Sequence, residues 1–275
     1  MSPRVGRPRR DAADRRSAVS GLDGSTFRAG IGLLPSDLQH DVPQLYRMLR
    51  TIDDLVDERD PEARPRLRAI ERWAHGQQAD SHEVRILNDL SRRYELPRDA
   101  IDEFCAGMRH DLAQAVIETE EDLERYCQYV GGSIGAVVAS MLGVLRASAE
   151  PKLAMLGRAF QRTNILRDID EDHTHGRLYI AATTIEQFGP PVPGAREQLL
   201  RDQIARADQL YEEGLGAINQ LVRGQRALAV SAALYREILR QIERDGYGRR
   251  PGRAVVPGWR EQLVIARHRF HMPQG

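Results

Sequence analysis

Lysine is almost missing from this chain of 275 residues, and cysteine is scarce. Lys152 is the only lysine, so mechanisms that need a placed lysine, such as a P-loop or a Schiff base, are poor candidates. The two cysteines, Cys105 and Cys127, are too few for a disulfide framework and have no CxxC spacing. A reducing compartment such as the cytoplasm fits this usage.

Net charge and long apolar runs are also absent. The 40 basic and 40 acidic side chains give a formal net charge of zero, which argues against a protein that coats nucleic acid. The longest apolar stretch, residues 134–145, is too short to span a bilayer and includes two glycines and a serine. We therefore expect no nucleic-acid partner and no transmembrane helix.

The N-terminus departs from this balance. Residues 1–16 hold six arginines against two aspartates, include proline and glycine, and show no periodicity. The segment lacks the apolar region of a secretory signal. We expect residues 1–22 to form a disordered basic tail, with a functional basic arm as the alternative.

Alternating β-patterns are lacking, whereas helical periodicity is strong. One apolar stripe steps 4-3-4-3-4 through Leu38, Val42, Leu45, Leu49, Ile52 and Val56. Further helices are predicted at 63–77, 80–93, 97–117, 120–147, 151–172, 195–222 and 226–245. No composition shift or long linker divides the chain. The sequence predicts one all-α domain over residues 23–265, a helical bundle that encloses a central cavity, followed by a C-terminal tail at 266–275.

Two pairs of aspartates are the strongest chemical signal. Asp53 and Asp57 are four residues apart, as are Asp168 and Asp172, so each pair lies on one helix face. One such pair alone is usually a solvated surface feature. Two facing pairs would repel each other unless a cation lay between them, and their oxygens suit Mg²⁺, which completes its shell with water and substrate phosphates. The pattern favours a magnesium site for diphosphate chemistry.

Neighbouring polar residues support this interpretation. Tyr46 and Arg50 lie on the same helix face as Asp53 and Asp57. This polar stripe borders the apolar stripe of the same helix, as the wall of an internal cavity requires. Arg50 and Arg167 can hold a phosphate or steady an aspartate, and Asn164 can add a metal oxygen. Asp54 and Asp170 lie off the shared faces and are expected to be surface charges.

Three glycines interrupt the predicted helix at 120–147. Gly131, Gly132 and Gly135 each cost on the order of 1 kcal/mol relative to alanine inside a helix. Close packing of two helices and the wall of a ligand cavity are both consistent with them. The segment is not a dinucleotide fingerprint because its spacing differs and no strand precedes it. The sequence has no HExxH motif, which leaves zinc-peptidase chemistry unsupported. Gly131-Gly132-Ser133-Ile134-Gly135 has the GxSxG spacing, but no strand precedes it as a nucleophile elbow requires, so acyl-transfer chemistry is also unsupported.

These residues resemble the squalene/phytoene synthases, a family of head-to-head prenyltransferases with the all-α isoprenoid synthase fold. The resemblance runs from about residue 27 to 260. Its motifs are Leu33-Leu34-Pro35, the segment 46–58, Gly107-Met108-Arg109-His110-Asp111-Leu112, the segment 126–135, Gln161 to Tyr179 and the closing helix 227–247. The chain departs from the family pattern in its leader, 23–29, and in having Ile180-Ala181 where a proline usually follows Tyr179.

The resemblance implies a set of site residues. Metal ligands would be Asp53, Asp57, Asn164, Asp168 and Asp172, with Mg²⁺ as the ion and Mn²⁺ as an alternative. The four aspartates together with Tyr126 and Tyr179 would be catalytic. Substrate would be bound by Phe27, Tyr46, Arg50, Gln161, Asn164, Arg167, Arg177 and Tyr235.

The implied reaction joins two prenyl diphosphates, most readily two C20 geranylgeranyl diphosphates, to phytoene through a cyclopropylcarbinyl diphosphate. Alternatives are a C30 synthase that makes presqualene diphosphate, squalene or dehydrosqualene, a terpene cyclase, and a non-catalytic assembly factor of the same fold. NADPH, which squalene formation needs, is not expected. We expect a cytoplasmic protein with peripheral membrane contact, because the product would be an insoluble hydrocarbon.

Overall fold

The computed structural model describes residues 30–270 and is helical throughout, with no strand in this range beyond an isolated bridge between Val144 and Leu221. Phe27 and the predicted tail at 1–22 lie outside the described residues. The α-helices are α2 (Leu38–Asp57), α3 (Ala63–Ala74), α4 (His82–Leu90), α5 (Arg98–Ala113), α6 (Glu120–Cys127), α7 (Ser133–Leu142), α8 (Glu150–Thr174), α9 (Ala182–Phe188), α10 (Glu197–Leu215), α11 (Gln225–Arg244) and α12 (Gly258–Phe270). The all-α prediction is confirmed.

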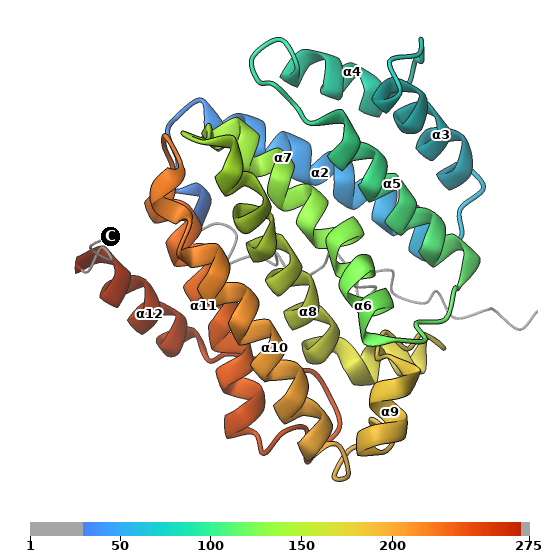
Figure 1. The fold of residues 1–275 in the computed structure, drawn as a ribbon, viewed down its shortest axis with the longest axis vertical. Helices are drawn as coiled ribbons and strands as arrows, with labels where there is room; N and C mark the ends of the chain where they lie inside the picture. Colours follow the sequence, from blue (N-terminus) through green and yellow to red (C-terminus); the bar gives the residue numbers. More distant parts are fainter. Residues whose placement is uncertain (1–29, 271–275) are drawn as a thin grey trace, which may run out of the picture.

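Helix α8 is the centre of the bundle (Figure 1). It packs against α7 on one side and against α10 and α11 on the other, while α2 and α5 close the bundle beyond α7. Residues Gln161 to Ile169 of α8 are all buried, so the helix has no solvent-exposed face over this stretch. A helix enclosed in this way brings any polar side chain it carries into the interior.

Buried polar groups on α8 are matched by partners on its neighbours. Arg162 is completely buried and donates to Glu120 and Glu124 on α6 and to Gln203 on α10. A buried charge is tolerated when it is paired and hydrogen-bonded in this way. The arrangement ties α6, α8 and α10 together.

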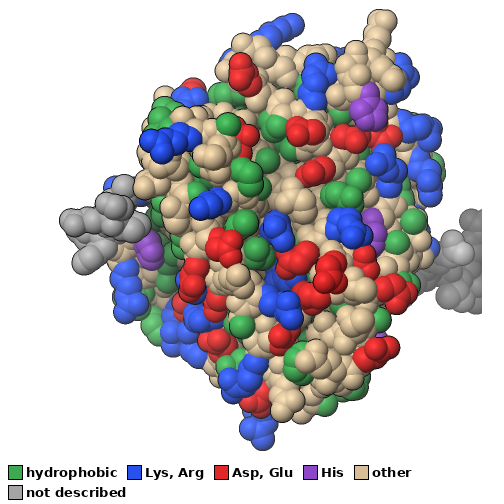
Figure 2. Space-filling view, viewed as in Figure 1, with side chains coloured by type: hydrophobic (Ala, Val, Ile, Leu, Met, Phe, Trp, Pro, Cys, Tyr) green, Lys and Arg blue, Asp and Glu red, His purple; other side chains and the backbone are tan. Residues whose placement is uncertain are grey.

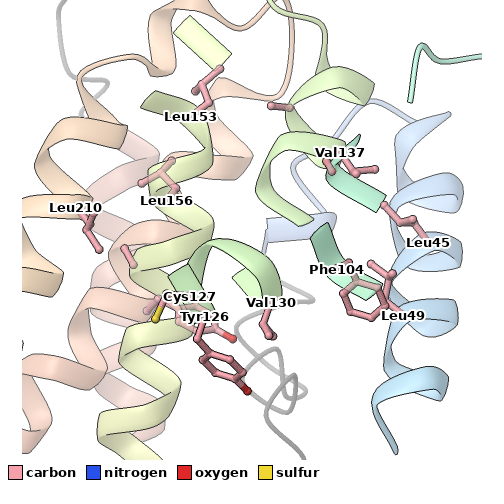
Figure 3. Packing of buried hydrophobic residues seen from close by; sticks show 14 of the residues in the cluster. Leu45, Leu49, Phe104, Tyr126, Cys127, Val130, Val137, Leu153, Leu156 and Leu210 are labelled. Atoms are coloured by element: carbon pink, nitrogen blue, oxygen red, sulfur yellow. The ribbon is translucent and has the colours of Figure 1, made fainter. Parts of the chain in front are cut away.

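The hydrophobic core fills the space between these helices. Leu45 and Leu49 of α2 lie beside Phe104 of α5, while Leu153 and Leu156 extend from α8 (Figure 3). All of these side chains are at least 97% buried, which agrees with the apolar stripe read from the sequence for α2. The stripe therefore faces the core, as predicted.

The predicted helix at 120–147 is not continuous. It is divided by a π-helical turn, η2 (Gln128–Gly132), and it ends at Leu142. Gly131 of η2 lies directly against Gly157 of α8, and a Cβ on either residue would overlap the backbone of the other. Close packing of two helices is thus one reason for these glycines.

Two helices were not predicted from the sequence. Helix α9 follows the turn after α8, and α12 crosses residue 265, where the C-terminal tail was predicted to begin. Helix α12 packs on the outside of α11 (Figure 1). Within residues 30–270 no helix combines the length and the apolar composition that a membrane crossing requires.

Candidate active site

The two acid pairs face one another from α2 and α8. Asp53 and Asp168 are buried, and Asp57 and Asp172 are half-buried near the C-terminal ends of their helices. Burial, followed by the negative charges of Asp168 and Asp57, raises the pKa of Asp172 to about 8, even though Arg177 opposes the effect. Because the carboxylates of α2 and α8 change one another's pKa, they form one site.

Arginines partner one acid of each pair, Asp168 and Asp57. Arg167 donates from Nε and Nη2 to the two carboxylate oxygens of Asp168, at 2.8 and 2.6 Å, and Arg253 Nε lies 3.0 Å from Asp168 Oδ1. Arg177 is hydrogen-bonded to Asp57. This pairing keeps positive charge at the place where a diphosphate would need it.

Arg50 has a different partner from its neighbours on the stripe. Its Nε lies 3.0 Å from Asp54 Oδ1, one turn further along α2. The same guanidinium also lowers the pKa of Asp57, although burial is the largest influence and leaves that pKa raised overall. Arg50 is therefore close to the acid site, and Asp54 is a half-exposed partner of Arg50.

Tyr126 and Tyr179 meet at one carboxylate. Their hydroxyls donate to the two oxygens of Asp111 at 3.1 and 3.0 Å, and their rings stack with centroids 5.0 Å apart. Burial, and then the charge of Asp111, raises the pKa of both tyrosines well above the usual value, with Asp53 contributing for Tyr126. The tyrosine pair is thus neutral and lies close to the first acid pair.

An apolar cavity of about 150 Å³ leads away from this polar region. Its lining comes from α2, η2, α7, α8 and α11, together with the turn at 30–34. Gln161 and Asn164 are polar members of the lining on α8, and Asp168 follows Asn164 one turn later. Gly131 and Gly135 also line the cavity, so both interpretations of the glycine segment hold.

Tyr235 of α11 closes one wall of the cavity. It is 1% exposed, and its ring lies 4.5 Å, centroid to centroid, from that of Phe160. Burial raises its pKa well above the usual value, and Tyr46 is among the groups that raise it further. Tyr46 and Tyr235 are therefore neighbours, which brings the predicted aromatic residues of α2 and α11 together.

The donor set fits a hard divalent cation that is completed by substrate. Within residues 30–270 no three His, Cys, Asp or Glu side chains are close enough together to form a metal cage by themselves. Mg²⁺ is usually held by one or two carboxylates plus water and phosphate oxygens, so a complete protein cage is not required. Burial is the largest cause of the raised pKa values of Asp57 and Asp172, and a cation bound beside these carboxylates would favour their charged forms.

Three residues at this site were missed or misjudged from the sequence. Asp111 lies in a recognised motif, Gly107 to Leu112, but was not singled out as a site residue. Arg253 had no signal, because it lies in a loop of glycine, proline and arginine after α11. Asp170 is not a plain surface charge: it accepts hydrogen bonds from Arg196 and from the backbone N–H of Gly252, beside the loop that carries Arg253.

Comparison with known proteins places these residues in context. A model of the squalene/phytoene synthase family matches residues 23–260. A phytoene synthase from Thermus thermophilus is 31% identical over 88% of this chain and 86% of its own length. A presqualene diphosphate synthase from Zymomonas mobilis is 27% identical over 86% of each chain. The crystal structure of a dehydrosqualene synthase in complex with ligand superposes with a TM-score of 0.81 at 26% identity, covering 92% of this chain and 94% of that one.

Proposed function

The chain belongs to the squalene/phytoene synthase family and is a prenyltransferase, and we propose that it condenses two C20 prenyl diphosphates head to head into phytoene. In the first half-reaction one substrate loses diphosphate, and its C1 is joined to the double bond of the second substrate with loss of a proton. The product is a cyclopropylcarbinyl diphosphate. In the second half-reaction this intermediate loses its diphosphate, rearranges and loses a proton.

The observation that carries this proposal is the junction of the acid site with the apolar cavity. Asn164 lines the cavity, and Asp168 follows it one turn further along α8. Asp172, one turn beyond Asp168, is influenced by the charge of Asp57 on α2. A prenyl diphosphate has the same division into an anionic head and a long apolar tail. The geometry supports a substrate whose diphosphate lies near Asp168 and whose chain follows α8 toward Leu153.

We propose that Asp53, Asp57, Asp168 and Asp172, with the oxygen of Asn164, hold Mg²⁺, with Mn²⁺ as an alternative ion. When bound, the ion would stabilise the negative charge of the leaving diphosphate. Arg50, Arg167 and Arg177 contribute fixed positive charge to the same region, and Arg253 adds a further guanidinium beside Asp168. Once the acids bind a cation, the arginines are no longer their counter-charges. The positive charge of the arginines would then be available to the diphosphate.

Tyr126, Tyr179 and Tyr235 would steady the developing allylic cation. Neutral phenol oxygens and ring faces stabilise positive charge without acting as strong nucleophiles, and the raised pKa values keep these phenols neutral. Gln161, which lines the cavity, and Tyr46, which influences the pKa of Tyr235, would bind substrate near this point. The apolar lining excludes water, which would otherwise capture the cation as an alcohol.

Chain length and redox chemistry separate the alternatives. A C30 synthase would use a C15 diphosphate, and the squalene branch would in addition consume a hydride from NADPH. Phytoene formation balances without a reductant, and we propose that NADPH is not used. We also propose that the protein works in the cytoplasm in peripheral contact with a membrane, because a C40 hydrocarbon product is insoluble in water.

The direct test is an incubation of the purified protein with Mg²⁺ and either the C15 or the C20 diphosphate, with and without NADPH. Mass spectrometry of the organic extract should show a C40 hydrocarbon from the C20 substrate alone. A C30 product would assign the protein to the triterpene branch of the family. An alcohol or a cyclised C20 product would contradict head-to-head condensation.

A matched pair of variants tests the acid site. Asp168→Asn should abolish turnover while circular dichroism shows an unchanged helix content. Asp99→Asn changes an exposed aspartate in the first turn of α5 and should leave turnover unchanged. Full activity of Asp168→Asn would refute the site, and full support of its cellular role without turnover would favour the assembly-factor alternative.

A further inference from the structure

A second hollow lies beside α8, and arginine dominates its lining. It is a cleft of about 540 Å³ between the second half of α8, the start of α10, the end of α11 and the loop at 245–254. It shares no lining residue with the apolar cavity, although α8 contributes to both. The charged residues of its lining are one acid, Asp245, and the arginines Arg167, Arg196, Arg244, Arg249, Arg250 and Arg253. We call this feature the arginine cleft.

Two of these arginines have no counter-charge in the described part of the chain. Arg249 and Arg250 are exposed in the loop, and neither makes an ion pair or a side-chain hydrogen bond with any residue in 30–270. Arg244 is balanced by Glu237, whose Oε1 lies 2.6 Å from its Nη2. Asp245 is a single acid and cannot offset both remaining charges. Positive charge is therefore in excess in the cleft, whereas acidic and basic side chains lie next to one another over the face shown in Figure 2.

A buried arginine in the lining has an unused donor. The Arg196 side chain is 1% exposed, and its two terminal nitrogens donate to Asp170. Its Nε has no hydrogen-bond partner in the described chain. A side chain at Gly248 would overlap this guanidinium, so the loop passes it with bare backbone. Buried donors are normally satisfied, which makes this nitrogen a place where an oxygen of a bound anion or of water is expected.

The arginine cleft adjoins the acid site through two shared guanidiniums. Arg167 and Arg253 line the cleft, and both reach the carboxylate of Asp168. The N–H of Gly252 donates to Asp170 at 2.7 Å, which holds the loop against α8 next to Arg253. One carboxylate balances two guanidiniums here, so this contact adds to the excess of positive charge in the cleft.

The lining selects a class of ligand. Planar guanidiniums bind phosphate oxygens through paired hydrogen bonds, and several of them together favour an anion with more than one charge. Among the described residues no aromatic side chain lines the cleft, so a nucleobase would have no ring on which to stack. We propose that the arginine cleft binds inorganic diphosphate at a site separate from the acid pairs. The choice of diphosphate over phosphate rests on the proposed function, because the proposed reaction releases two diphosphates beside Asp168.

Isothermal titration calorimetry of inorganic diphosphate into the full-length protein tests the site. The buffer contains a chelator and neither Mg²⁺ nor prenyl substrate, so that the aspartates of the acid site repel the anion and the arginine cleft is measured. Wild type should bind one diphosphate per chain. Arg249→Gln/Arg250→Gln should bind it roughly tenfold more weakly or not at all, since each substitution removes a charged hydrogen-bond donor.

A matched variant removes the same charge elsewhere. Arg85→Gln/Arg92→Gln changes two exposed arginines whose nearest acids are 4.0 and 3.9 Å away. They lie at the α4 end of the molecule, opposite the loop that follows α11 (Figure 1). This variant should bind diphosphate within about twofold of wild type, because distant charges are screened by salt. Circular dichroism should show the same helix content in both double variants, since all four substituted side chains are exposed.

Two further titrations distinguish the ligand and the sites. Inorganic phosphate should bind wild type roughly tenfold more weakly than diphosphate, because it reaches fewer of the guanidiniums. Asp168→Asn should bind diphosphate at least as tightly as wild type, since asparagine no longer neutralises Arg167 and Arg253. Neither titration depends on turnover, so the proposed function and this site can fail separately.

Four results would overturn the proposal. Equal affinity of wild type and Arg249→Gln/Arg250→Gln would exclude the cleft, and equal losses in the two double variants would show an effect of net charge alone. Loss of binding in Asp168→Asn, with full binding in Arg249→Gln/Arg250→Gln, would place the diphosphate at the acid site. Equal affinity for phosphate and diphosphate would refute diphosphate as the ligand.

Discussion

Replacing Asp170 with asparagine should destabilise the protein by about 3 kcal/mol, although Asp170 belongs to neither acid pair. Its carboxylate oxygens accept from both terminal nitrogens of Arg196 at 2.6 and 2.7 Å, and the N–H of Gly252 donates to Oδ2 at 2.7 Å. Arg196 is only 1% exposed and the Asp170 side chain is 19% exposed. The variant would leave a buried guanidinium without its counter-charge.

The magnitude follows from the burial of Arg196. Removing one partner of a buried ion pair costs about 3–5 kcal/mol, because the other charge remains desolvated. Asparagine retains one accepting oxygen and Asp170 is partly exposed, so the lower end of that range applies. For a chain of this length about 3 kcal/mol lowers Tm by about 6–12 °C.

The assay is thermal and urea unfolding followed by circular dichroism. The matched control is Glu197→Gln, one residue after Arg196, which breaks a pair with Arg201 in which both side chains are more than half exposed. That change should leave Tm and the urea midpoint essentially unchanged, because an exposed pair is screened by solvent. The double variant Asp170→Leu/Arg196→Met removes both charges and should recover most of the loss. A loss below 0.5 kcal/mol in Asp170→Asn, or strictly additive effects in the double variant, would refute this account.

Three further outcomes follow from the fold. Gly131→Ala should destabilise the protein by roughly 1–3 kcal/mol in urea unfolding, since the new methyl group overlaps the backbone of Gly157. Glu83 is buried, but hydrogen bonds from Arg66 and from backbone outweigh that burial and lower its pKa. Its contribution to stability should therefore be complete above its usual pKa and be lost as the pH falls through the lowered value, so the stabilities of wild type and Glu83→Gln should converge at acidic pH. Val138→Phe should fill part of the apolar cavity and reduce turnover of the C20 diphosphate more than that of the C15 diphosphate in the extraction assay.

Each of these has a control and a contrary outcome. Gly76→Ala serves as a comparison for Gly131→Ala, because Gly76 has open space around it and any cost there reflects its positive φ alone. A constant stability difference between wild type and Glu83→Gln from pH 3 to 7 would show that the pair with Arg66 is not linked to protonation. Unchanged chain-length preference in Val138→Phe would mean that the prenyl chain does not occupy the cavity.

The convergence of the acid pairs could be predicted because it depends on local periodicity. Spacing of four residues places Asp168 and Asp172 on one face wherever a helix forms, and the apolar stripe of α2 sets the direction in which that helix faces. Arg253 and the Asp170–Gly252 contact could not be predicted, since a loop reaches α8 from 82 residues away. No local sequence pattern predicts the path of such a loop.

Helix α12 was missed for a related reason. Periodicity identifies a helix by the apolar stripe that it turns toward a core, and α12 turns Trp259 and Leu263 away from α11. The half-buried apolar residues of α12, Val264 and Ile265, are adjacent and too few to form a periodic stripe, so the sequence pattern did not predict a helix there. Asp111 could have been predicted as a site residue, because it lies in a recognised motif. The hydrogen bonds from Tyr126 and Tyr179 to its carboxylate could not, because they depend on how three separate segments are arranged in space.

The π-helical turn at 128–132 sets the rotational phase between the two halves of an otherwise continuous helical rod. Tyr126 precedes this turn and points toward Asp111, whereas Val138 follows it and lines the cavity. A π turn contains one residue more than an α turn, and one residue corresponds to about 100° of rotation. If the same residues formed a regular α-helix, every residue of α7 would therefore lie about 100° further round the helix axis and Val138 would leave the cavity wall. The π turn itself is what allows Tyr126 to reach Asp111 while Val138 lines the cavity.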